Sequence, residues 1–158
     1  MEPVVRRAYD HGSMSVTNPL TRLPMLRPVP IFRGLPKSTL LEVARRAAEV
    51  IVPAGGVIVA QGDPGDALCI IASGTVEVRR DDRPVAQMTA GDYFGEISLI
   101  DGKPRSATVV AVDEVVLLTI TAATFDSLLS IPYVARAALT GLAERVREAH
   151  ASHDRRPI

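Results

Sequence analysis

The chain has 158 residues, enough for one domain with extensions and too few for two full domains. Apolar residues make up 47% of it, but aromatics only 4% and Trp is absent, so the core must be built from Val, Ile, Leu and Ala. The 18 basic residues balance the 18 acidic ones, which argues against non-specific nucleic-acid binding through overall charge.

The single cysteine and the short apolar runs bear on the cellular compartment of the protein. Cys69 has no partner for an internal disulfide, and its neighbours in ALCIIA predict a buried strand residue. No apolar run reaches the roughly 20 residues that a membrane-spanning helix needs. The N-terminus lacks the apolar core of a signal peptide. We therefore expect a cytoplasmic protein with no membrane partner.

The composition and the hydrophobic periodicity of the sequence change near residue 31. Residues 1–30 carry five of the twelve prolines and show no sustained periodicity, so we expect a flexible Pro-rich arm. The folded domain is expected over 31–150 and a disordered tail over 151–158. After Pro36, apolar residues at helical spacing predict an amphipathic helix over about 37–48.

Short β-type runs follow, separated by Gly, Pro and Asp clusters that are typical of turns. Their regular spacing favours a sandwich or barrel. The clean alternation in TVEVRR predicts a strand with one solvated face. The runs are VIVPAGG, VIVAQGDPGD, ALCIIASG, TVEVRRDD, RPVAQMTAGD, SATVVAVDE and VVLLTIT.

Helical periodicity returns after Thr121. TAATFDSLLS predicts a short helix with Thr121 as its N-cap, and Pro132 opens a second helix over about 132–149. The second helix has a narrow apolar seam that covers only about two heptads. We expect this seam to pack on the chain's own barrel, with a dimer seam as the alternative. The seam residues are Ala135, Ala138, Leu139, Leu142, Val146 and Ala149.

The stretch YFGEISLIDGKPRSATV, Tyr93 to Val109, holds the residues with binding chemistry. Gly95 permits a close backbone approach, and EISLI predicts one helical turn whose first N–H groups could face an anion. Arg105 can supply a planar fork of donors to the same anion. An ionised Glu96 would repel a phosphate, so it should face hydrogen-bond donors. Together these features indicate a sugar phosphate with one free hydroxyl.

Each of these residues also has a structural explanation when taken alone. Acids are favoured in the first turn of any helix, which accounts for Glu96. Arg105 could be a solvated loop charge, Gly95 a tight turn and Ser106 the start of a strand. The structural explanation weakens for the set, because it leaves the fixed spacing of Gly-Glu and Arg-Ser unexplained.

The segment FGEISLIDGKPRSATV resembles the phosphate-binding cassette of cyclic nucleotide-binding domains. A second block, QGDPGDALCIIASGTVEV from Gln61 to Val78, resembles another signature of that family. The resemblance covers about residues 31–149. It implies a mainly β fold like the effector domain of catabolite activator protein: an eight-stranded jelly-roll-like β barrel (double-stranded β-helix) with one helix before and two after.

The resemblance also implies roles for individual residues. Glu96 would bind the ribose 2′-hydroxyl and Arg105 the cyclic phosphate, while Gly95 would let the backbone approach the ribose. Amides near Ile97 and Ser98 would complete the cradle. The expected nucleotide-binding residues are Phe94, Gly95, Glu96, Ile97, Ser98, Arg105, Ser106 and Ala107.

The same resemblance favours cAMP over cGMP as the ligand. A Thr after the cassette arginine accompanies cGMP selectivity in the family, and this chain has Ser106 at that position. Asp63 and Asp66 are interpreted as turn formers rather than ligands. A residue that caps the base is expected on the last helix, where the candidates are Tyr133, Arg136, Leu139 and Leu142.

We therefore expect a stand-alone regulatory sensor that signals through its last helix, either to an unknown protein effector or within a homodimer. Two alternatives stay open: an interaction scaffold that no longer binds nucleotide, and part of a transcription regulator with a separate DNA-binding subunit. Only residues 151–158 follow His150, so no recognition helix and no direct nucleic-acid contact are expected. The only histidines, His11, His150 and His153, lie near the chain ends, which argues against a metal or an enzyme.

Overall fold

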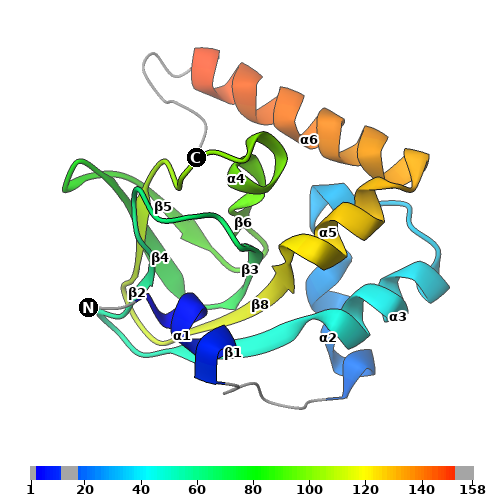
Figure 1. The fold of residues 1–158 in the computed structure, drawn as a ribbon, viewed down its shortest axis with the longest axis horizontal. Coiled ribbons are helices and arrows are strands. Elements are labelled where there is room, and N and C mark those ends of the chain that lie inside the picture. Colours follow the sequence, from blue (N-terminus) through cyan, green and yellow to red (C-terminus); the bar gives the residue numbers. More distant parts are fainter. Residues whose placement is uncertain (1–2, 12–17, 152–158) are drawn as a thin grey trace.

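Eight strands form two four-stranded antiparallel sheets in the computed structural model, which describes residues 3–11 and 18–151 (Figure 1). One sheet has the order β1-β8-β3-β6, and the other has the order β2-β7-β4-β5. The expected mainly β, jelly-roll-like architecture is confirmed, as two sheets rather than one closed barrel. The strands are β1 (Ala48–Val52), β2 (Val57–Val59), β3 (Ala67–Ser73), β4 (Thr75–Arg80), β5 (Arg83–Thr89), β6 (Tyr93–Phe94), β7 (Thr108–Ala111) and β8 (Val115–Thr121).

The strands follow the predicted β-type runs. In β4, Val76 and Val78 are fully buried while Thr75 and Glu77 are partly exposed and Arg79 is exposed, which confirms the solvated face predicted for TVEVRR. Strand β6, which the seven predicted runs do not include, has only two residues and pairs with β3 through Cys69 and Ile70. Two residues are too few to produce a periodic signal, so the sequence pattern did not reveal this strand.

Helices precede, interrupt and follow the strands. The helices predicted over about 37–48 and 132–149 are confirmed, and so is the Thr121 cap of the short helix between them, because its side chain accepts a hydrogen bond from Thr124 N at 3.2 Å. Helix α4 forms the predicted turn in the cassette. The elements are α1 (Val4–His11), α2 (Pro19–Leu26), the 3₁₀ turn η1 (Pro30–Phe32), α3 (Lys37–Arg46), α4 (Glu96–Asp101), α5 (Ala122–Leu129) and α6 (Pro132–Ala151).

The N-terminal part differs from the expected flexible arm over 1–30 and from the expected single helix before the barrel. Within the described residues, two α-helices and a 3₁₀ turn precede α3. Proline is favourable at a helix start, and Pro19 occupies that position while the Asn18 side chain accepts from Leu20 N at 3.0 Å. Leu23 and Leu26 are buried against the fold. Of the tail expected over 151–158, residues 152–158 lie outside the described residues.

Two apolar clusters share the strands β3 and β8. Inside the sandwich, Cys69, Ile71 and Leu117 pack between the sheets. On the outer face, Leu68 and Ile120 pack under the helices of the N- and C-terminal parts. Both faces of these strands are therefore covered, which explains why their sequences are apolar throughout rather than alternating.

Helix α6 crosses the top of the sandwich in Figure 1 and buries only part of the predicted seam. Val134 and Ala138 are buried, at 1% and 5% exposure, but Leu139 is 66% and Val146 is 43% exposed. The expectation that the whole seam packs on the barrel is thus wrong for Leu139 and Val146. In the described part of the chain, no helix combines the length and apolar character needed to cross a bilayer.

Candidate functional site

The chain turns sharply between β6 and α4 at Gly95. This residue has φ of +98°, in the left-handed region where a side chain is strained. A Cβ atom here would also lie 2.7 Å from the Ala67 carbonyl oxygen and would overlap the Arg105 guanidinium. Only glycine meets both conditions, so the backbone at Gly95 can pack directly on Arg105.

The backbone of Arg105 is fixed by the loop between β2 and β3. Arg105 N donates to the Asp63 carbonyl at 2.8 Å, and Gly62 N donates to the Arg105 carbonyl at 2.9 Å. These two bonds join the two sequence blocks that carry the family resemblance. The position of Arg105 therefore depends on both blocks.

The Arg105 side chain lies almost fully inside the protein. It donates from Nη2 to the Ala67 carbonyl at 2.8 Å and from Nη1 to the Gly95 carbonyl at 3.3 Å. Its Nη2 also lies 3.5 Å from Asp66 Oδ1, and only 4% of the side chain is exposed. A buried guanidinium held this way is a fixed cation beside Gly95.

The sequence interpretation missed the role of the β2–β3 loop. Asp66, expected only as a turn former, is the ion-pair partner of Arg105. Gly65 approaches α4 so closely that a Cβ atom would overlap the Ser98 side chain. A signal for this pairing was available in the block QGDPGD, where Asp66 follows a glycine. A buried arginine needs a counterion, and this carboxylate could supply it.

Glu96, the first residue of α4, carries a buried carboxylate that meets helix α6. Its side chain is 2% exposed, and its Oε1 lies 2.7 Å from Arg145 Nη1. Arg145 also donates to the Tyr93 carbonyl and stacks over the Tyr93 ring, 4.0 Å from its centroid. The sequence interpretation did not single out Arg145, since one arginine in a charged helix carries no local signal.

Burial makes the ionised form of Glu96 costly. It raises the pKa of the Glu96 carboxyl above its ordinary value, and the charges of Arg145 and Arg105 offset part of that rise. Among the described residues, neither carboxylate oxygen has a hydrogen-bond donor in good geometry. The carboxylate is therefore paired by charge and still able to accept a hydrogen bond.

The structure brings seven of the eight expected binding residues around one cavity of about 20 Å³, with room for little more than one water molecule. Glu96 does not line this cavity, because its carboxylate is engaged by Arg145. Val59 and Val109 complete the lining. The seven residues are Phe94, Gly95, Ile97, Ser98, Arg105, Ser106 and Ala107.

None of the expected base-capping residues on α6 lines this cavity. Tyr133 is 53% exposed, and its hydroxyl donates to the Arg33 carbonyl at 3.4 Å. Leu139 is more exposed still, at 66%. The residue of α6 that reaches the cassette is instead Arg145.

Cys69 lies in β3 opposite Phe94 and is fully buried. Burial raises the pKa of its thiol to about 12, with the charge of Arg105 opposing the shift. It is thus the buried apolar residue that the sequence predicted. No group of three or more His, Cys, Asp or Glu side chains suited to a metal occurs in the described residues.

Comparison with known proteins gives one family. The model of the cyclic nucleotide-binding domain matches residues 49–131. A cyclic nucleotide-gated potassium channel of Rhizobium etli is 46% identical over 102 residues, which are 65% of this chain and 28% of the channel. A cAMP-dependent protein kinase regulatory subunit of Aspergillus niger is 38% identical over 92 residues, which are 57% of this chain and 22% of that subunit.

A solved structure agrees with the sequence comparison. The catabolite activator protein of Thermus thermophilus superposes with a TM-score of 0.70 and 35% identity, covering 78% of this chain and 61% of that one. The chain thus spans only part of each relative's length. The matched region contains the glycine elbow and the buried Glu96 and Arg105. By these matches the chain belongs to the family of cyclic nucleotide-binding domains.

Proposed function

We propose that the chain binds a cyclic nucleotide, with cAMP preferred over cGMP, and acts as a regulatory sensor rather than as an enzyme. One observation carries the proposal: a buried guanidinium and a buried carboxylate, Arg105 and Glu96, lie on either side of Gly95. A cyclic nucleotide presents a phosphate anion and a ribose hydroxyl close together, and so matches this pair of opposite charges.

The two charged residues divide the recognition between them. The cyclic phosphate takes the donors of Arg105, which are already oriented by Gly95 and Ala67. The ribose 2′-hydroxyl donates to Glu96, whose buried carboxylate can accept a hydrogen bond. The backbone at Gly95 approaches the sugar because no side chain intervenes. Phe94, Ile97, Ser98, Ser106 and Ala107 supply the remaining surface of the cavity.

Ligand entry is coupled to helix α6 in this proposal. The cavity of about 20 Å³ must enlarge to admit a nucleotide, and the Glu96 carboxylate must turn from its charge partner Arg145 toward the ribose. Competition between the hydroxyl and Arg145 releases the C-terminal part of α6. The ligand can shift this equilibrium only by its difference in affinity for the two positions of the helix.

The exposed side of α6 is where the signal would leave the domain. Leu139 and Val146 lie seven residues apart on that side and are both exposed. We propose that this surface contacts a protein effector or the same helix of a second copy, so that a movement of α6 changes the contact. The cAMP-dependent protein kinase regulatory subunit and the catabolite activator protein among the similar proteins support a regulatory output.

A second candidate, an interaction domain that binds no nucleotide, is favoured by the small size of the cavity and the engagement of Glu96 by Arg145. The two candidates differ in a single measurement. Calorimetric titration with cAMP, cGMP and 5′-AMP should show saturable binding of the cyclic nucleotides, tighter for cAMP. Absence of heat and of a thermal shift with all three ligands would leave the interaction domain as the function.

Substitution of Arg105 tests the residue that carries the phosphate. Arg105→Ala should cost about 2–5 kcal/mol of cAMP binding, because a buried partner of the phosphate charge is lost. Arg83→Ala, at an exposed position in β5, is the matched control and should bind like the unmodified chain. Far-ultraviolet circular dichroism checks that both variants keep the fold. An affinity for cAMP within twofold of the unmodified chain in Arg105→Ala would refute the assignment.

A further inference from the structure

Helix α1 is docked on the sandwich at the place where both sheets end. The strand orders put β1 at the edge of one sheet and β2 at the edge of the other, and α1 contacts both. Val5 is 1% exposed and belongs to the apolar cluster between the sheets, which also includes Val50 and Ile58. Figure 1 shows α1 in front of these two strands. The N-terminal helix therefore covers the open edge of the fold.

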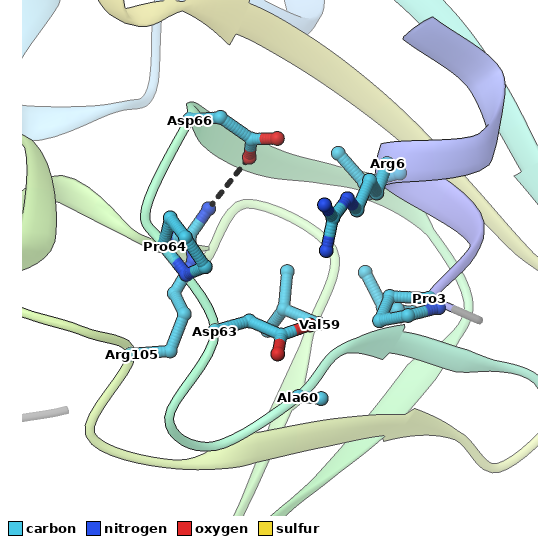
Figure 2. Close-up of a pocket in the computed structure, with 10 residues that line it drawn as sticks. Pro3, Arg6, Val59, Ala60, Asp63, Pro64, Asp66 and Arg105 are labelled. Carbon is cyan, nitrogen blue, oxygen red and sulfur yellow. Dashed lines mark ion pairs between the residues drawn. The ribbon is translucent and has the colours of Figure 1, made fainter. Parts of the chain in front are cut away.

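Docking of Val5 brings the next residue, Arg6, into a second cavity of about 160 Å³. Figure 2 shows the Arg6 side chain entering this cavity from α1, with Asp66, Asp63 and Arg105 around it. Arg105 and Val59 also line the smaller cavity of the cassette. The two cavities thus share Arg105 and Val59 in their lining.

The charges around this second cavity have a consequence for an anion bound at Arg105. In the structure Asp66 is the counterion of Arg105, at 3.5 Å, and 47% of the Asp66 side chain is exposed. A phosphate that binds Arg105 replaces Asp66 as its counterion and would be repelled by Asp66 and Asp63. A cation facing these carboxylates lowers that repulsion, and Arg6 is placed to be this cation.

We propose that Arg6 is a positioning residue for nucleotide binding, which acts on the phosphate through Asp66 and Asp63 and not by touching the ligand. The inference rests on the proposed function, since it assigns the anion at Arg105 to the cyclic phosphate. By linkage, the bound nucleotide then tightens the docking of α1 by the same factor that docked α1 tightens nucleotide binding. The N-terminal helix becomes a second reporter of the ligand, on the side of the sandwich away from α6.

The matched pair for the test is Arg6 and its neighbour Arg7, which is exposed on the same helix and does not line the cavity. Calorimetry of the full chain with cAMP is expected to show binding weaker by about three- to tenfold in Arg6→Glu, the size of a reversed, partly exposed charge contact. Arg7→Glu is expected to stay within twofold of the unmodified chain. The loss in Arg6→Glu should shrink as salt rises, since screening acts on charge and not on packing.

A double-mutant cycle tests whether the effect of the Arg6 charge on cAMP binding depends on the docking of α1. Val5→Asp should undock α1 and weaken cAMP binding, and adding Arg6→Glu to it should have no further effect. Hydrogen exchange of the α1 amides should slow on cAMP addition in the unmodified chain and in Arg7→Glu, but not in Arg6→Glu.

Two failures are distinguishable. If the unmodified chain binds cAMP and Arg6→Glu matches Arg7→Glu at every salt concentration, the role of Arg6 is refuted and the proposed function stands. If the unmodified chain binds no cyclic nucleotide, the proposed function fails and the role of Arg6 falls with it.

Discussion

Arg105 is held in place by hydrogen bonds of both its backbone and its side chain. The backbone pairs with the β2–β3 loop, while the guanidinium reaches carbonyl groups of Gly95 and Ala67. Little conformational freedom is left for the side chain to lose when an anion binds. A fixed, desolvated cation is worth more to a phosphate than a mobile surface charge, which is why its burial matters.

Glu96 lowers the stability of the fold but supplies an acceptor for the ligand. Burial raises the pKa of its carboxyl, so the folded chain holds this proton more tightly than the unfolded chain. The stability contributed by the residue therefore falls as pH rises from the ordinary pKa of 4.5 through the raised pKa of the folded state. The ionised carboxylate is therefore a cost to the fold that the ribose hydroxyl can reduce.

We accordingly predict that Glu96→Gln raises the free energy of unfolding at pH 7 while it weakens cAMP binding. The gain in stability should narrow as pH falls through the raised pKa of Glu96, because the unmodified carboxyl then takes up its proton in the folded chain. Urea unfolding of both proteins at a series of pH values measures this. Glu114→Gln, at an exposed position, is the control. A variant less stable than the unmodified chain at pH 7 would contradict the prediction.

At the scale of elements, the elbow between β6 and α4 depends on one residue. Gly95 adopts φ of +98° and also packs on Arg105, so a side chain there is strained and displaces the guanidinium. Gly91 is the useful comparison, because it has φ of +92° with no atom near its Cβ position.

The two glycines give a prediction that separates strain from displacement. Gly95→Ala and Gly91→Ala should both lower the free energy of unfolding, by about 1 kcal/mol or more, because alanine is strained at positive φ. Only Gly95→Ala should also weaken cAMP binding, by at least tenfold. Equal affinities in the two variants would show that the approach of Gly95 to Arg105 does not matter for the ligand.

Helix α6 holds the cassette through Arg145 rather than through its apolar seam. We predict that Arg145→Met raises the affinity for cAMP by about tenfold, because a charged contact of about 1.5 kcal/mol no longer has to be broken for the ribose. Methionine keeps the aliphatic packing over Tyr93, and Arg147→Met on the exposed side serves as control. An affinity that stays constant or falls would mean that Arg145 remains on Glu96 in the bound state.

At the scale of the whole molecule, the strands β3 and β8 connect the cassette to the helices. One face of these strands packs inside the sandwich, and the other packs under α2, α3, α5 and α6. A change at Phe94 or Glu96 therefore meets a rigid sheet on one side and the Arg145 end of α6 on the other. Since packed cores deform little, movement is expected at α6 rather than within the sheets.

The distance between α6 and the sandwich should report this movement. Ala54→Cys in the β1–β2 turn and Arg147→Cys on α6 give two exposed sites for spin labels, and Cys69 will not react because it is buried with a pKa of about 12. We predict that saturating cAMP changes the distribution of label-to-label distances and that 5′-AMP does not. An identical distribution with bound cAMP would place the output elsewhere than in α6.

The sequence by itself determined the parts of this protein that depend on neighbours along the chain. Alternating Val76 and Val78 predicted a half-buried strand, and Thr121 predicted a helix start, because both signals arise within a few residues. The spacing of Gly95, Glu96 and Arg105 likewise indicated a sugar-phosphate site, and the family resemblance identified this site as a phosphate-binding cassette. The structure confirmed the strand and the helix start and brought Gly95 and Arg105 together beside one cavity, while Glu96 turned toward α6.

Only the tertiary structure decided which distant residues meet. The pairs Arg145 with Glu96 and Asp66 with Arg105 join positions 49 and 39 residues apart, and no local pattern shows that the two members of either pair meet. The proline-rich residues 1–30 suggested a flexible arm, whereas the edges of both sheets supplied an apolar surface for Val5. Local propensity sets which elements form, but burial and charge pairing across the fold decide how those elements are joined.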